Sequence, residues 1–325
     1  MKNILTEEWE SEYSFHVDLQ HISDLTQNVV LNKLEVLDWY DRGHISVSDL
    51  YIVYAVSMLT FANTYQIIDY ITLWKEHNKD IPIPSTMDKD SIVSRLKTLC
   101  GGSFLRRHKF TNINGEPRDY FYTTPHGNNF LKKLLYFKGN YDEYLGAIHI
   151  QEVLKYLSIN QISLKVIESI AAKYPIEVSS KPFFTTHSLY FDKATRSTVE
   201  IYGFFNLKDR NKRILLEPFR MKYDELCYSK NQMVTLAEER FEFLKRYISD
   251  FVRDNSGSES LNVVFVCENL ASIKILAKQI SKWDEYFYSY VSFTTDKLIR
   301  DKGLENSSFK VKLDDGKVKL VIGSL

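Results

Sequence analysis

The sequence predicts a mixed fold, α+β in its first half and α/β in its second. In the first half, three segments with helical spacing of apolar residues precede an Asn-Gly turn and a further helix. In the second half, strand-like and helix-like segments alternate, which is typical of an α/β domain. The chain has 325 residues, of which 44% are hydrophobic and 26% are charged, enough for two ordinary globular domains.

Residues 1–45 are expected to form an acidic N-terminal arm and a packing helix, the latter over residues 31–42. Three helices follow, because apolar residues recur at helical spacing and residues suited to N-caps precede two of these segments. Their expected ranges are 49–61 after Ser48, 65–77 after Thr64, and 87–99. Gly101 and Gly102 come after the third helix and predict a left-handed C-cap.

Beyond these helices the apolar residues change from helical to alternating spacing. Strands are expected over residues 103–111 and 118–123, because Asn114-Gly115 between them is a strong short signal for a hairpin. A further helix is expected over residues 128–137. Three helices, a hairpin and a helix form the order of a winged helix-turn-helix, which we therefore predict for residues 46–140.

Charge is distributed unevenly, although the formal net charge of the whole chain is zero. Residues 1–30 hold one lysine and six acidic residues, whereas residues 85–140 hold ten basic and four acidic residues. Since salt screens charges beyond roughly 8 Å, a nucleic-acid backbone responds to the local field rather than to the total charge. The basic segment covers the third helix and the hairpin, so the distribution favours DNA as a partner.

The predicted DNA-binding residues lie on the third helix and on the hairpin. In a winged helix the third helix enters the major groove, where arginine reads guanine and serine meets base edges or phosphates. A basic hairpin is suited to phosphates or to the minor groove. The predicted residues are Lys89, Ser91, Ser94, Arg95, Lys97, Arg106, Arg107, Lys109, Asn112, Asn114 and Arg118. The alternative is a winged helix that binds protein, with solvated basic residues.

Three segments of the winged helix carry a family pattern: 92–99, 104–107 and 120–127. The pattern resembles the winged helix of the replication-relaxation family, whose members are associated with plasmids and integrative elements of Gram-positive bacteria. Residues 264–266 resemble a late strand of that family's second domain. The resemblance spans residues 45–290 and implies a second domain of restriction-endonuclease type.

The second half, residues 141–325, is expected to form this α/β domain. A continuous apolar run at residues 262–267 is typical of a central strand that is covered on both faces. The expected helices are 146–157, 163–173, 235–253 and 271–283, and the expected strands are 188–192, 199–207, 213–219, 262–267 and 288–294, with a terminal hairpin over 309–322.

A restriction-endonuclease fold raises the question of a Mg²⁺-dependent nuclease, which needs two carboxylates and a lysine on adjacent strands. The nearest carboxylate candidates are Asp192 or Glu200 with Glu217. Arg220 stands where the lysine would lie, and Pro218 would interrupt the strand ladder. Because arginine keeps its proton, it is a poor substitute for a water-orienting lysine. We therefore expect a degenerate domain without catalytic residues.

The sequence contains no pattern typical of a metal site, a phosphate-binding loop or a membrane span. Cys100, Cys227 and Cys267 are too far apart for a CxxC zinc site and fit a reducing compartment. The eight histidines have no paired ligand spacing, and no glycine-rich phosphate loop follows a strand. No apolar run is long enough for a membrane span, and the N-terminus has no apolar signal segment. We expect a cytoplasmic protein with no cofactor, no metal and no membrane partner.

The leading hypothesis is a sequence-specific accessory protein that binds double-stranded DNA during plasmid or mobile-element replication or transfer. In this hypothesis the C-terminal domain binds a relaxase, a replication protein or a second copy of the chain as a homodimer. The first alternative is a transcriptional regulator with the same winged helix and a C-terminal dimerisation or sensing domain. The second alternative is the Mg²⁺-dependent nuclease.

Overall fold

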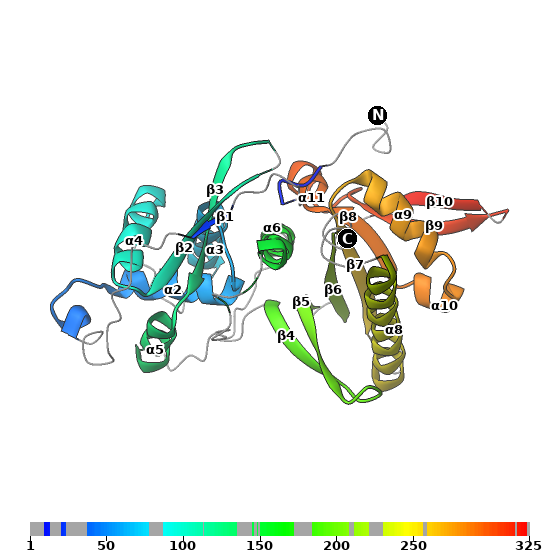
Figure 1. The fold of residues 1–325 in the computed structure, drawn as a ribbon, viewed down its shortest axis with the longest axis horizontal. Helices are drawn as coiled ribbons and strands as arrows, with labels where there is room; N and C mark the ends of the chain where they lie inside the picture. Colours follow the sequence, from blue (N-terminus) through cyan, green and yellow to red (C-terminus); the bar gives the residue numbers. More distant parts are fainter. Residues whose placement is uncertain are drawn as a thin grey trace.

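The computed structural model has helices and strands in both halves, which confirms the mixed α and β prediction (Figure 1). It describes residues 10–13, 21–23, 38–77, 87–112, 114–134, 145, 148, 150–171, 184–207, 211–220, 230–255, 259–315 and 317–323. Of the helix predicted over residues 31–42, residues 38–42 are described, and 38–41 of these are helical. Among the described residues, no helix is both long and apolar enough to cross a lipid bilayer.

Three helices follow, α2 (Val47–Leu59), α3 (Thr64–His77) and α4 (Lys89–Gly101). Helix α2 begins two residues earlier than predicted, because Ser46 rather than Ser48 is its N-cap. The Asp49 carboxylate accepts hydrogen bonds from the Ser46 backbone N–H at 2.6 Å and from its hydroxyl at 2.8 Å. This capping arrangement satisfies backbone donors that a helix start leaves open.

The end of α4 differs from the predicted left-handed glycine cap. Gly102 has φ −83°, and the next residue, Ser103, takes the positive φ of 58° instead. Glycine is still required at position 102, because a Cβ there would lie 2.7 Å from the Phe104 ring and 2.9 Å from the Trp39 ring. The glycine therefore allows a close approach of rings rather than an unusual backbone conformation.

A three-stranded sheet follows, with strand order β1-β2-β3. Its strands are β1 (His21–Ser23), β2 (Leu105–Thr111) and β3 (Pro117–Thr123), all antiparallel, and α5 (Pro125–Leu134) comes next. The predicted hairpin is confirmed, with Gly115 at φ 77° in its turn. Between α2 and α3, Ala62 exchanges two backbone hydrogen bonds with Phe121 of β3, at 3.1 and 2.8 Å. The segment that joins these two helices is thereby fixed to the sheet.

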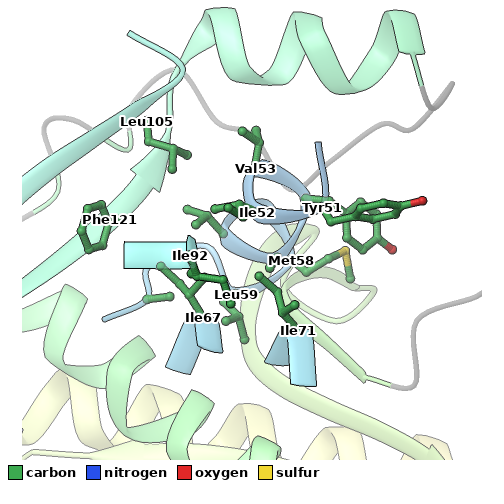
Figure 2. Packing of buried hydrophobic residues seen from close by; sticks show 14 of the residues in the cluster. Tyr51, Ile52, Val53, Met58, Leu59, Ile67, Ile71, Ile92, Leu105 and Phe121 are labelled. Atoms are coloured by element: carbon green, nitrogen blue, oxygen red, sulfur yellow. The ribbon is translucent and has the colours of Figure 1, made fainter. Parts of the chain in front are cut away.

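One hydrophobic cluster joins the three helices to this hairpin (Figure 2). Helix α2 is buried along most of its length, and Ile52 and Val53 are fully enclosed. Ile67 of α3 and Ile92 of α4 pack in the same cluster, together with Phe121 of β3. A helix that is apolar on all sides belongs at the centre of a domain, and α2 has that position.

The second half contains a seven-stranded sheet with strand order β10-β9-β8-β7-β6-β5-β4. The strands are β4 (Phe184–Asp192), β5 (Ser197–Leu207), β6 (Lys212–Phe219), β7 (Ser260–Cys267), β8 (Val291–Thr295), β9 (Ser308–Asp314) and β10 (Lys317–Gly323). Strands β6, β7 and β8 are parallel, and the other pairs are antiparallel. Strand β7 is central and buried over residues 261–267, as its apolar run predicts.

The remaining helices are α6 (Ile150–Ala171), α8 (Lys230–Asn255), α9 (Leu270–Ile280), α10 (Glu285–Tyr288) and α11 (Asp296–Lys302). Helix α6 is one helix where two were predicted. Polar residues at the expected break bond to carbonyls instead of ending the helix. The Ser158 hydroxyl donates to the Lys155 carbonyl at 2.8 Å, and the Asn160 amide donates to the carbonyls of Leu59 and Phe61 at 2.9 and 2.6 Å.

Helix α6 lies between the small sheet and the large sheet (Figure 1). Its residues Ile159, Ile162 and Val166 belong to the hydrophobic cluster that also holds α2, while Leu216 of β6 and Val264 of β7 join the same cluster from the large sheet. The opposite face of the large sheet is covered by α8 and α9. The hydrophobic cores of the two halves therefore meet through α6, and the boundary predicted at residue 140 stays a prediction.

Candidate nucleic-acid interface

Three of the predicted DNA-binding residues line a groove between α4 and the β2–β3 hairpin. The groove has a volume of about 170 Å³. Lys97 lines it from α4, Arg106 and Arg107 from β2, and Asp119 from β3. Helix α4 and strand β2 thus place three cationic side chains around one groove. This arrangement is expected if the helix and the hairpin bind the same ligand.

Three of the predicted cations are exposed and have no anionic partner among the described residues. They are Lys97 on α4 and Arg106 and Lys109 on β2. Within the ranges that the structure describes, none of the three side chains forms a hydrogen bond or an ion pair. Lys89, at the start of α4, is also exposed, and its ammonium lies 5.5 Å from the centre of the Tyr65 ring. These four charges are available to an external anion.

Arg95 is engaged by the protein itself. Its Nε donates to Asp49 Oδ1 at 2.7 Å, and its Nη2 donates to Asp49 Oδ2 at 2.6 Å and to the His44 carbonyl at 2.9 Å. The Asp49 side chain has no exposed area, whereas that of Arg95 is 32% exposed. The hydrogen bonds to this carboxylate raise the pKa of Arg95. The same donors hold α4 against α2, so the predicted bidentate contact of Arg95 with guanine stays a prediction that would require Arg95 to leave Asp49.

Two more predicted arginines have partners on the hairpin. Arg107 donates from Nε and Nη2 to Asp119 Oδ2, at 3.0 and 2.8 Å. Arg118 donates to Glu116 at 2.6 Å. Both pairs are partly exposed, so either arginine can exchange its carboxylate for a phosphate at low cost. They support a phosphate-binding surface less strongly than Lys97 and Arg106.

Asn112 builds the hairpin turn and does not face solvent. It is 1% exposed, and its Oδ1 accepts the backbone N–H groups of Asn114 and Glu116 at 3.0 and 2.8 Å. Its Nδ2 donates to Glu116 Oε2 at 3.0 Å. The amide is used to close the turn, so the predicted contact of Asn112 with DNA stays a prediction that this geometry does not support. Asn114 is exposed at the tip of the same turn.

The two predicted serines of α4 differ in exposure. Ser94 is exposed one turn before Thr98, whereas Ser91 is partly buried in the first turn. The Ser91 backbone N–H donates to the N-cap Asp88 at 2.8 Å, and the hydrogen bonds from Ser91 lower the pKa of Asp88. Ser94 is therefore the serine with the better access to a ligand in the groove region.

Two residues of α3 that the sequence pattern does not indicate as binding residues border this surface. Thr64 lines the groove and donates to Asp119 Oδ1 at 3.2 Å. Tyr65 is 61% exposed beside Lys89. Both residues lie in the first turn of α3, which is the one feature of the sequence that could have indicated them. In the structure the start of α3 lies beside the start of α4, where Tyr65 contacts Lys89.

The carboxylates considered for a nuclease are neutralised by arginines of α8. Arg240 donates to both oxygens of Glu217, at 2.8 and 2.5 Å, and Arg246 donates to Asp192 at 2.7 and 3.2 Å. Both carboxylates are almost fully buried, with 6% and 4% exposure. Among the described residues, no group of three or more His, Cys, Asp and Glu side chains is arranged to hold a metal ion. These pairs fasten α8 to β4 and β6.

Glu200 lies in a second cluster of charged and tyrosine side chains, between α6 and β5. The Tyr156 hydroxyl donates to Glu200, and the Tyr202 hydroxyl donates to Glu152 at 2.9 Å. Burial, together with the nearby Glu152 carboxylate, raises the pKa of Glu200 to about 7. Lys155 pairs with Glu152 at 2.7 Å. The cluster therefore links α6 to the large sheet through groups whose charge depends on pH.

No protein-family model, curated protein or solved structure matches this chain. The resemblance to the replication-relaxation family thus stays a prediction from the residues that carry it.

Proposed function

We propose that residues 46–140 contain a winged helix-turn-helix that binds double-stranded DNA. The order of α2, α3, α4, the β2–β3 hairpin and α5 supports this proposal. The Ala62–Phe121 bridge adds support, because it pairs the segment between α2 and α3 with the second strand of the hairpin. In this proposal α4 is the recognition helix and the hairpin turn is the wing.

The observation that carries the proposal is the set of free cations at the groove. Lys97 and Arg106 come from different elements, are exposed, and have no anionic partner among the described residues. A side chain that stabilises the fold usually has such a partner, as Arg95 and Arg240 do here. Cations held free beside a groove suit a ligand that brings its own regularly spaced negative charge, which a DNA backbone does.

The contacts of Arg95 change which residues we expect to contact bases and which we expect to contact phosphates. Because Arg95 braces α4 against α2, base reading falls to the exposed residues of α4, namely Lys89, Ser94 and Lys97. Arg106 and Lys109 of β2 are suited to phosphates, with Arg107 and Arg118 able to contribute after releasing their carboxylates. We expect much of the affinity from the backbone and modest discrimination between base sequences.

For the biological role, we propose an accessory protein of plasmid or mobile-element replication or transfer that acts in the cytoplasm. The residues that resemble the replication-relaxation family support this role. We propose that the second half is a degenerate restriction-endonuclease-type domain, supported by the succession of α6, three antiparallel strands, α8 and the parallel strand β7. The pairing of Glu217 and Asp192 with arginines supports a structural task for these carboxylates.

The test is binding of the full chain to a fluorescent duplex, measured by anisotropy between about 50 and 200 mM salt, where phosphate contacts change affinity steeply. The variant Lys97→Ala/Arg106→Ala/Lys109→Ala removes three free cations. The control Lys274→Ala/Lys278→Ala/Lys282→Ala removes three exposed lysines of the α9 region and changes the net charge equally.

We expect tight, salt-sensitive binding that the first variant loses and the control keeps. Competition between a random duplex and the DNA upstream of the gene measures sequence preference. Absence of binding to any duplex, or equal losses in both variants, would contradict the proposed interface.

A further inference from the structure

Strand β10 ends the large sheet and exposes one unpaired edge. It pairs with β9 alone, over all seven of its residues, from Lys317–Asp314 to Gly323–Ser308. Among the described strands, none lies against its outer edge. An exposed strand without proline offers a row of backbone donors and acceptors to another strand. Natural sheets often protect such an edge with proline or charged side chains; β10 has no proline, and its charged residues are Lys317 and Lys319 alone.

The same region gathers exposed apolar side chains. Leu313 of β9 and Val318 and Ile322 of β10 are exposed by 36 to 41%, and Ile275 of the neighbouring helix α9 by 44%. Val318 lies opposite Leu313, and Leu320 opposite Val311, so these side chains share one face of the sheet. That face continues inward to the hydrophobic cluster under α9, which Val311 and Leu320 join. The apolar surface is therefore an extension of the core to the edge.

We propose that this edge pairs with the same edge of a second copy of the chain, antiparallel and centred on Leu320. In that register Leu320 meets Leu320 of the other copy, and Val318 meets Ile322. All three residues lie on the apolar face, so one row of apolar pairs crosses the junction.

The lysines of β10 fit the same register. Lys319 comes opposite Val321 and Lys317 opposite Gly323, so no two lysines of the two strands face each other directly. Shifting the centre to Lys319 would place two lysines opposite each other, which is destabilising. The sequence of β10 is therefore self-complementary about Leu320, which selects a second copy over an unrelated strand.

The pairing is isologous and closed, as in most soluble dimers, and joins two seven-stranded sheets into one. The β9–β10 hairpin lies at the end of the molecule opposite α4 (Figure 1). Two copies joined at β10 would therefore leave both grooves beside α4 uncovered. The inference does not depend on DNA binding, and its test contains no DNA.

The test is the solution mass of the full chain at several protein concentrations, measured by light scattering, together with cysteine cross-linking. We expect a mass that rises toward twice 38.1 kDa. Ile322→Lys adds a charge to the apolar row and should return the protein to a monomer. Tyr286→Lys, at a comparably exposed site on α10, should not. Circular dichroism melting of both variants confirms that they are folded.

Cross-linking tests the register itself. Under mild oxidation Leu320→Cys should form a disulfide between copies, because the two positions face each other at the axis within reach of a disulfide. Lys319→Cys should cross-link only when it is mixed with Val321→Cys. A monomer at every concentration would overturn the proposal and leave the edge to a strand from another protein. A dimer that persists in Ile322→Lys and fails to cross-link through Leu320→Cys would place the interface elsewhere.

Discussion

The surface around α4 and the contacts between α8 and the large sheet use the same basic residue types in opposite ways. Lys97 and Arg106 are exposed beside a groove with no anionic partner among the described residues. Arg240 and Arg246 instead reach buried carboxylates and hold a helix against strands. The comparison teaches that partner and burial, rather than residue type, separate a binding cation from a structural one.

Arg95 illustrates the distinction. It lies on α4 like the proposed binding cation Lys97, but it contacts a buried carboxylate, as the structural arginines Arg240 and Arg246 do. It lies two residues before Lys97, yet its guanidinium is bound to the fully buried Asp49. We therefore expect changes at the Arg95–Asp49 pair to affect folding and changes at Lys97 to affect binding.

The largest expected effect comes from Asp49→Ala. Removing one partner of a buried ion pair costs about 3–5 kcal/mol in the free energy of unfolding, and the partial exposure of Arg95 places this change near the lower end. The same variant loses the capping contacts at Ser46. Urea denaturation measures the loss. Asp38→Ala, which breaks an exposed pair with Arg42, is the control and should cost no more than about 1 kcal/mol. Equal losses would remove the distinction between the two kinds of pair.

A smaller effect is expected from the Glu200 cluster, and it depends on pH. Burial raises the pKa of Glu200 in the folded chain to about 7, above its ordinary value of 4.5. The folded state therefore holds this proton more tightly, and the resulting stability is complete below about pH 4.5 and lost as the pH rises through about 7. A shift of this size corresponds to about 3 kcal/mol.

Glu200→Gln should remove this pH dependence, because the amide cannot titrate in that range. Urea denaturation at about pH 5 and about pH 8 compares the two chains, and the difference between these pH values should shrink in the variant. Glu242→Gln, at an exposed pair with Lys245, is the matched control. An unchanged pH dependence in Glu200→Gln would show that other groups cause it.

Arg106→Ala should change binding without changing stability. Its side chain is exposed and has no partner among the described residues, so the free energy of unfolding should stay within about 0.5 kcal/mol. If it contacts one phosphate, the slope of log affinity against log salt should fall by about 0.9. Anisotropy titrations at several salt concentrations measure the slope. A large loss of stability would instead assign Arg106 to the structural group.

The smallest effect is expected from Arg118→Ala. Glu116 already neutralises this arginine at 2.6 Å, so removing it frees an acidic side chain as it deletes a basic one. Its salt slope should change less than that of Arg106→Ala, while its stability changes by about 0–1 kcal/mol. Equal slopes for the two variants would mean that Arg118 leaves Glu116 when DNA binds.

Local patterns predicted the elements better than they predicted the contacts. The alternating segments, the hairpin turn and the apolar run of β7 each depend on neighbours in sequence, and all three are present in the structure. Helix α6 was divided wrongly, because Asn160 bonds to carbonyls of Leu59 and Phe61 about a hundred positions away.

The site residues show the same limit. Helical spacing places Arg95 on the polar side of α4, but Asp49, which engages it, lies 46 positions earlier. Asn112 carries an amide suited to reading bases, yet the oxygen of that amide accepts two backbone N–H groups of the same turn. Exposure of Lys97 and Arg106 follows from the pattern, whereas their lack of a partner depends on the whole fold.

The central claim is that the cations around α4 and the hairpin bind DNA while those elsewhere do not. Chemical acetylation of lysines, read by mass spectrometry with and without a duplex, tests it directly. The account predicts that Lys89, Lys97 and Lys109 react readily in the free protein and are protected by DNA, whereas Lys274 and Lys278 of α9 react equally in both states. Protection of the α9 lysines with Lys97 and Lys109 left reactive would contradict the account.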